Sequence, residues 1–180
     1  MKKNRIILLL AAVLWLASSV SAATVERIAV RSEAMKKDIP VVVIVPDAAK
    51  SGVRMPVLYL LHGYSGDQET WLNVKPSLPQ MADRDSVIVV CPDGENSWYW
   101  DSPRDPSSRF ETFVARELID YVDARYPTRA DRSGRAITGL SMGGHGGLWR
   151  GRVTYFARQG DPVIRTGSEA AAPRCSETND

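Results

Sequence analysis

Two uninterrupted apolar segments predict strands that are buried on both faces. Residues 57–61 read VLYLL and residues 86–91 read SVIVVC. Each run ends at a loop that contains glycine, at positions 62–66 and 92–94. Short runs that are apolar throughout and end in this way are typical of central parallel strands. Between them, residues 78–84 predict a short helix.

The segments that precede these runs predict an antiparallel pair of strands. Residues 24–32 alternate weakly between apolar and polar side chains, and residues 39–45 are strongly β-branched. The polar stretch 33–38 between them fits a turn. An antiparallel edge followed by central parallel strands is therefore expected.

A longer helix is predicted to begin at Ser108. Ser108 and Glu111 have the spacing of a capping box, with serine at the N-cap and glutamate at N3. Pro127 ends the helix, residues 131–134 form a turn, and residues 135–139 predict a short strand. This order of strands and strand–helix units indicates an α/β fold with a mostly parallel sheet and an antiparallel edge. The apolar face of the helix comprises Phe110, Phe113, Val114, Leu118, Tyr121 and Val122.

The strongest chemical motif follows that last strand. Residues 139–143 read GLSMG, and a G-x-S-x-G sequence between a strand and a helix is a nucleophile elbow. The turn is so tight that Ser141 must adopt a strained backbone, and a side chain at either glycine would collide with a neighbouring element. The Ser141 hydroxyl is then exposed at the carboxyl end of the sheet. The Met142 N–H lies at the helix N-terminus, where an oxyanion can form.

Three glycine-containing motifs together resemble the esterase D family of α/β-hydrolases, and the secreted bacterial members in particular. They are LHGYSG at 61–66, PDG at 92–94 and GLSMGGHG at 139–146. The family includes S-formylglutathione hydrolases, feruloyl and acetylxylan esterases and mycolyltransferases. The resemblance covers roughly residues 25–149 and implies the α/β-hydrolase fold.

The same resemblance assigns expected roles to single residues. It implies that Ser141 is the nucleophile and that Met142 and Tyr64 supply the N–H groups of an oxyanion hole. The residues expected to border the substrate pocket are Gly63, Glu95, Asn96 and Trp98.

The sequence departs from the family pattern after the elbow. In this fold an acidic residue and then a histidine follow the nucleophile, but the chain holds only His62 and His145. We interpret His145, one helical turn beyond the nucleophile, as structural, and His62 as a residue that orients its loop. Helical periodicity also disappears near residue 150. We therefore expect the N-terminal part of an α/β-hydrolase domain, residues 23–149, truncated after the elbow. An atypical tail, residues 150–180, is expected to be disordered. Our hypothesis for it is a shifted reading frame near codon 150, and the alternative is a natural short variant with a new ending.

The N-terminus predicts an exported protein. A basic start, an apolar run and the small residues of VSA at 20–22 are the three regions of a secretory signal peptide, residues 1–22. Because no cysteine lies near the cleavage site, a lipid-anchored form is not expected. We expect a secreted or periplasmic protein that has no membrane partner after cleavage.

Composition narrows the range of partners. The 23 basic and 21 acidic residues nearly balance, which gives no reason to expect a nucleic-acid partner. The two histidines and two cysteines have no metal-ligand spacing, so we expect no metal and no cofactor. We interpret Cys91 as a small buried hydrophobe.

The sequence leaves three functions open. The first is a serine carboxylesterase that acts on acetyl, feruloyl or short acyl esters of carbohydrates and is impaired in this chain by loss of the triad Asp and His. The second is acyl transfer to a sugar acceptor, and the third is a non-catalytic remnant that binds carbohydrate. In each case the partner is a small molecule or a polysaccharide, and the aromatic run Trp98, Tyr99 and Trp100 suits either ligand binding or ordinary packing.

Overall fold

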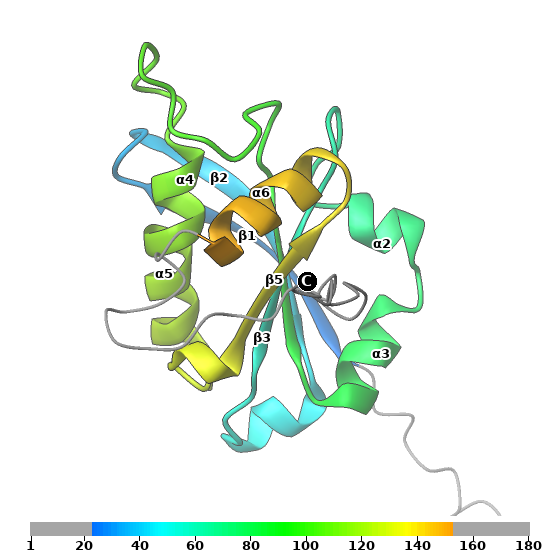
Figure 1. Ribbon diagram of the computed structural model, residues 1–180. Helices are drawn as coiled ribbons and strands as arrows, with labels where there is room; N and C mark the ends of the chain where they lie inside the picture. Colours follow the sequence, from blue (N-terminus) through cyan, green and yellow to red (C-terminus); the bar gives the residue numbers. More distant parts are fainter. Residues whose placement is uncertain (1–22, 153–180) are drawn as a thin grey trace, which may run out of the picture.

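A computed structural model describes residues 23–152 as one mixed sheet of five strands between helical layers (Figure 1). The predicted signal peptide, residues 1–22, lies outside the described residues. The predicted tail begins inside the last helix, which ends at Arg152, and residues 153–180 are likewise outside the described part.

The strand order in the sheet is β1-β2-β4-β3-β5. β1 (Thr24–Ser32) pairs antiparallel with β2 (Lys37–Val45), which pairs antiparallel with β4 (Ile88–Pro92). β3 (Val57–Leu61) is parallel to both of its neighbours, β4 and β5 (Arg135–Gly139). Only β2 therefore runs against the other four strands, and the predicted mostly parallel sheet with an antiparallel edge is confirmed.

The central strands are apolar throughout because the sheet has a hydrophobic core on each face. Successive side chains of a strand point to opposite faces. Val41 and Val43 of β2 accordingly join one cluster of buried residues, while Val42 and Ile44 join the other. β3 and β4 divide their side chains between the clusters in the same way, which explains the uninterrupted runs in the sequence.

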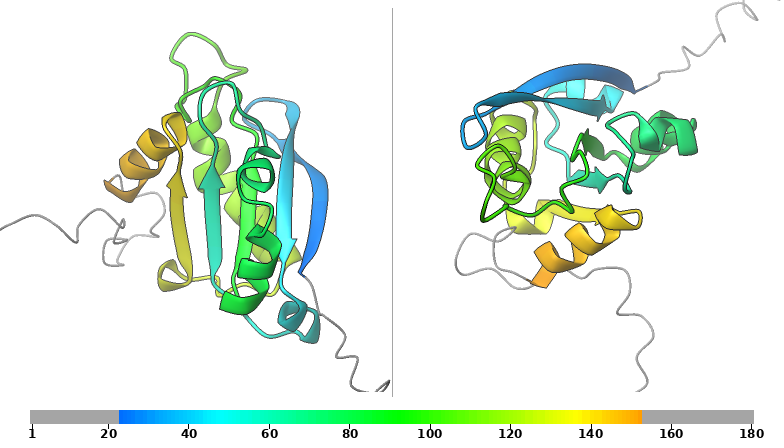
Figure 2. Two further views of the ribbon diagram at one scale, coloured as in Figure 1. Left: turned by 90° about the vertical axis from the view of Figure 1, so that its right-hand side faces the viewer. Right: turned by 90° about the horizontal axis from the view of Figure 1, so that it is seen from above.

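Helices cover both faces of this sheet (Figure 2). On one face lie α2 (Thr70–Val74) and α3 (Leu78–Asp85). Leu78 and Ala82 of α3 belong to the same buried cluster as Val42. On the other face a continuous helix is built from α4 (Phe110–Thr112), a π-helical segment, η2 (Phe113–Glu117), and α5 (Leu118–Arg125). Of two short 3-10 helices, η1 (Asp47–Ser51) lies between β2 and β3, and η3 (Arg132–Gly134) lies between α5 and β5. α6 (Met142–Arg152) follows β5. Within residues 23–152, no helix combines the length and the apolar character needed to cross a membrane.

The predicted capping box at Ser108 does not form. The N-cap of α4 is Arg109, whose own side chain makes no capping hydrogen bond. Ser108 is held in the preceding loop, because its N–H donates to the Asp105 carbonyl and its own carbonyl accepts the Ser102 N–H. Asp101 takes the capping task instead: its carboxylate accepts the Thr112 N–H at 2.9 Å and the Thr112 hydroxyl at 2.6 Å.

Candidate active site

Ser141 lies between β5 and α6 in the geometry predicted for a nucleophile elbow. Its φ of 51° falls in the left-handed region, which costs a non-glycine residue energy. Both flanking positions must be glycine, because backbone atoms of neighbouring segments lie where a Cβ would be. A Cβ at Gly139 would lie 2.4 Å from the Gly143 carbonyl carbon, and one at Gly143 would lie 2.3 Å from the Leu61 oxygen. The Ser141 side chain is exposed at the end of the sheet.

The loop that follows β3 lies against this elbow. The position of a Cβ on Gly63 is 3.6 Å from the Ser141 Cβ and 3.3 Å from the Leu140 carbonyl oxygen. The Leu140 N–H also donates to the Leu61 carbonyl at 3.1 Å. Parallel strands β3 and β5 thus bring Gly63 next to Ser141, and Tyr64, with 60% of its surface exposed, is the next residue of the same loop.

His62 joins this loop to the loop after β4. Its ring is buried, with Nδ1 2.7 Å from the Gly63 carbonyl oxygen and Nε2 2.7 Å from the Gly94 nitrogen. A backbone N–H can only donate, so Nε2 accepts and the proton resides on Nδ1. Both ring nitrogens are therefore occupied in holding the loops together, which is the geometry of a loop-orienting residue.

Tyr99 is buried, so of the two uses considered for the aromatic run this residue serves packing. Its hydroxyl accepts the His62 N–H at 2.9 Å, and burial raises the pKa of Tyr99, which keeps the hydroxyl protonated. Its ring fills the space over Gly94 and Gly146, where added Cβ atoms would lie 2.3 and 3.0 Å away. No local sequence pattern indicates this role of Tyr99, because the contacts join three distant segments.

The residues expected to border a substrate differ in their contacts and in their exposure. The Asn96 side-chain oxygen accepts the Ser65 N–H at 2.8 Å, so Asn96 supports the loop that contains Gly63 and Tyr64. The Glu95 carboxylate forms an ion pair with Lys37 of β2 at 2.6 Å. Trp98 has 49% of its surface exposed. Met142, the first residue of α6, is fully buried.

His145 is exposed and lies between two indoles. Its ring centroid is 5.7 Å from that of Trp98, nearly perpendicular, and 5.8 Å from that of Trp100, nearly parallel. The two tryptophans come from the loop after β4, whereas His145 belongs to α6. The elbow helix and this loop therefore meet through aromatic side chains.

A family model described as "Putative esterase" matches residues 32–154, a span that includes both glycine-rich loops and the elbow. The chain belongs to this esterase family. An acetyl esterase from Caldicellulosiruptor saccharolyticus is 38% identical over 97 residues, which cover 54% of this chain and 36% of the relative.

Solved structures agree with the fold of this esterase-family chain. A ferulic acid esterase has a TM-score of 0.64 and 27% identity, with 75% of this chain and 57% of the solved chain covered. An S-formylglutathione hydrolase from Agrobacterium tumefaciens has a TM-score of 0.63 and 24% identity, with 73% and 53% covered. This esterase-family chain thus spans about half the length of the solved chains and about a third of the acetyl esterase.

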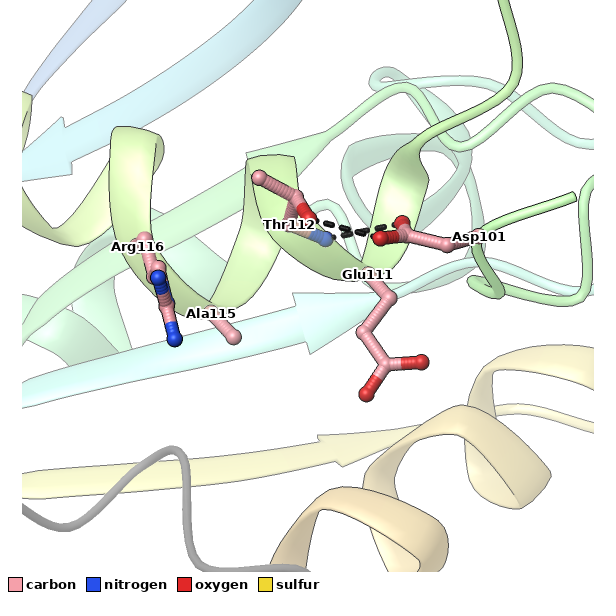
Figure 3. Close-up of a pocket in the computed structure, with 5 residues that line it drawn as sticks. All are labelled: Asp101, Glu111, Thr112, Ala115 and Arg116. Carbon is pink, nitrogen blue, oxygen red and sulfur yellow. Dashed lines mark hydrogen bonds between the residues drawn. The ribbon is translucent and has the colours of Figure 1, made fainter. Parts of the chain in front are cut away.

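A separate cavity of about 170 Å³ lies beside the start of the long helix (Figure 3). Asp101 lines it while capping Thr112, and Glu111 extends from α4 on the side of β5 and α6. Ser141 is not part of its lining. Within residues 23–152, His, Cys, Asp and Glu side chains do not gather in a group of three or more that could hold a metal ion. The lining residues are Asp101, Glu111, Thr112, Ala115 and Arg116.

Proposed function

We propose that this protein is a serine carboxylesterase with Ser141 as its nucleophile. The observation that carries the proposal is the strained, exposed Ser141 at the start of α6, with Gly63 of the neighbouring loop beside it. Supporting similarity comes from relatives named acetyl esterase and ferulic acid esterase. We propose acetyl, feruloyl or short acyl esters of carbohydrates as substrates, met outside the cytoplasm after signal-peptide cleavage.

The proposed reaction has two steps. The Ser141 oxygen attacks the ester carbonyl carbon, and the alcohol leaves with a proton as an acyl-enzyme forms. Water then attacks the acyl-enzyme, releases the acid and returns the proton to Ser141. The negative charge on the carbonyl oxygen in each step falls at the N-terminus of α6, where the N–H groups of Met142 and Tyr64 are the proposed donors.

Neither histidine of this chain is placed to act as a general base for Ser141. Of its two histidines, His62 uses both ring nitrogens in binding Gly63 and Gly94, and the His145 ring packs against Trp98 and Trp100. Loss of a triad member in a serine hydrolase costs on the order of 10⁴-fold in turnover. We therefore propose that a chain of this sequence turns over slowly.

The test combines turnover with covalent labelling. The chain is incubated with p-nitrophenyl acetate and, separately, with a fluorophosphonate probe, and the labelled peptide is identified by mass spectrometry. We expect slow turnover and a label on Ser141, both lost in Ser141→Ala and both retained in Ser107→Ala, which alters an exposed loop serine. Turnover or labelling that survives Ser141→Ala would contradict the proposal.

A further inference from the structure

Two reverse turns lie at the carboxyl ends of β3 and β4. The first, residues 63–66, and the second, residues 94–97, are each closed by a hydrogen bond between their end residues, at 3.0 and 3.2 Å. The first turn contains Tyr64, whose N–H is a proposed oxyanion donor. Because β3 lies between β4 and β5, this turn lies between the second turn and the elbow. The contacts that fix its backbone therefore bear on the proposed reaction.

Each turn is hydrogen-bonded to the other. The Gly94 N–H of the second turn donates to Nε2 of His62, which directly precedes the first turn, at 2.7 Å. The Ser65 N–H of the first turn donates to the Asn96 side-chain oxygen at 2.8 Å. Since a backbone N–H can only donate, the oxygen and not the nitrogen of the Asn96 amide faces Ser65. These two bonds fix the position of one turn relative to the other.

Ser65 has a backbone conformation that serine does not favour. Its φ is 62°, in the left-handed region, whereas Tyr64 before it has a negative φ. A left-handed third residue is the mark of a type II turn, which favours glycine or asparagine at that place. In the commoner type I turn the middle peptide is turned over, so that its N–H points the opposite way. Serine by itself favours type I, because a Cβ makes the left-handed conformation costly.

The Asn96 side chain opposes this preference. Turning over the peptide between Tyr64 and Ser65 would carry the Ser65 N–H away from Asn96 and break the 2.8 Å bond. One such hydrogen bond and the penalty for a left-handed serine are of the same order in free energy. The bond from Ser65 to Asn96 is therefore strong enough to decide which turn is populated.

The turn type in turn fixes the direction of the Tyr64 N–H. This N–H shares a trans peptide with the Gly63 carbonyl, which accepts the Gly66 N–H and lies 2.7 Å from Nδ1 of His62. The N–H and C=O of a trans peptide point in opposite directions, so the Tyr64 N–H points away from His62. The peptide on the other side of Tyr64 is the one that Asn96 holds. With both peptides bonded, neither backbone torsion of Tyr64 can rotate freely.

We infer that Asn96 is a positioning residue for the oxyanion hole, an inference that rests on the proposed function. It acts through the Ser65 N–H and has no need to touch the substrate. By keeping Ser65 left-handed, it keeps the Tyr64 N–H in the direction required for a charge that develops at Ser141. A residue with this role affects the rate of the chemical step, whereas a residue that only borders the substrate affects binding.

NMR of the full chain measures the turn type directly. In a type II turn the Ser65 amide proton lies beside the Tyr64 Cα proton, and in a type I turn it lies beside the Tyr64 amide proton. We expect the first contact in the nuclear Overhauser spectrum of the unchanged chain and the second in Asn96→Ala. In the double variant Ser65→Gly/Asn96→Ala the first contact should return, because glycine adopts the left-handed conformation without a steric penalty.

The rate at which a fluorophosphonate probe labels Ser141 measures the effect on the reaction. We expect Asn96→Ala to label about three- to tenfold more slowly, as the loss of one neutral hydrogen bond implies. The probe concentration that gives half the maximal rate should stay the same. The double variant Ser65→Gly/Asn96→Ala should recover most of the lost rate. The control Asn73→Ala removes an exposed amide from α2 and should label at the original rate.

Three results would overturn the inference. They are an unchanged turn in Asn96→Ala, labelling of that variant at the original rate, and a double variant that regains the turn but stays slow. The last would mean that Asn96 acts on the reaction by another route. Failure of the proposed function is read separately, because labelling would then survive Ser141→Ala. If only the inference fails, labelling depends on Ser141 and not on Asn96.

Discussion

At the residue scale, the elbow can pack closely against β3 because position 143 is glycine. Its missing side chain would lie 2.3 Å from the Leu61 oxygen, a backbone atom that cannot move without disturbing β3. We expect Gly143→Ala to lower the free energy of unfolding by at least about 1–3 kcal/mol, the usual cost of overpacking. Urea unfolding followed by circular dichroism measures this.

The matched control is Gly147→Ala, one turn further along α6. A Cβ there meets the Thr138 Cα at an ordinary 3.4 Å, and alanine is the better helix former by about 1 kcal/mol. This variant should be neutral or slightly stabilised. Equal losses in both variants would mean that the close approach at Gly143 is not what limits stability.

Cys91 supports a second prediction for a single residue. The thiol is buried in β4, in agreement with its interpretation as a small hydrophobe, and burial raises the pKa of Cys91 from 9.0 to about 12. Since the thiolate is the reactive form, the folded chain should not react at pH 8. In a Cys175→Ser variant, a colorimetric disulfide reagent should therefore report one thiol only after urea is added. Rapid reaction of the folded variant would contradict this prediction.

At the residue scale, local motifs could be predicted and long-range contacts could not. Ser141, Gly139 and Gly143 are recognisable because the demands of a tight turn fall on neighbouring residues. The His62 N–H donates to the Tyr99 hydroxyl and the Gly94 N–H donates to the His62 ring, and each bond spans more than thirty positions of the sequence. No spacing rule connects such residues, so the anchoring role of Tyr99 emerged only from the fold.

At the scale of elements, the start of the long helix is capped by Asp101 and not by the capping box predicted at Ser108. The Asp101 carboxylate accepts both the N–H and the hydroxyl of Thr112, whereas Ser108 is held in the loop. We expect Asp101→Ala to cost about 0.5–2 kcal/mol, the usual cost of losing a helix cap, and Ser108→Ala to cost almost nothing. Thermal unfolding of both variants measures the difference. The reverse order would restore the capping box predicted from the sequence.

Strands were easier to predict than helix ends for a physical reason. Residues 57–61 and 86–91 are apolar throughout because both faces of the sheet are covered, and this requirement acts on every residue of a strand. A helix cap depends on one side chain, which can come from outside the local sequence. Asp101 lies eleven positions before Thr112 and reaches it only because the loop between them folds back through the bridge between Asp101 and Arg109.

At the scale of the whole molecule, β5 lies at one end of the sheet although it carries the elbow. This chain covers about half of the solved structures that share its fold. Among residues 23–152, β5 pairs only with β3. Alternate N–H groups of Arg135–Gly139 therefore face away from the strands that the structure describes. An unpaired strand edge is a template for association with another segment or another chain.

Hydrogen exchange tests the state of this edge in a chain of the given sequence. We expect the amides of β5 that face β3 to exchange slowly and those that face outward to exchange rapidly, because no strand within residues 23–152 pairs with the outward amides. The amides of β4, paired on both sides, provide the protected reference within the same molecule. NMR with assigned amide signals resolves this alternation along Arg135–Gly139.

Slow exchange of the outward amides would mean that another strand covers them. A dilution series then separates the sources: protection that disappears on dilution comes from a second copy, and protection that persists comes from the same chain.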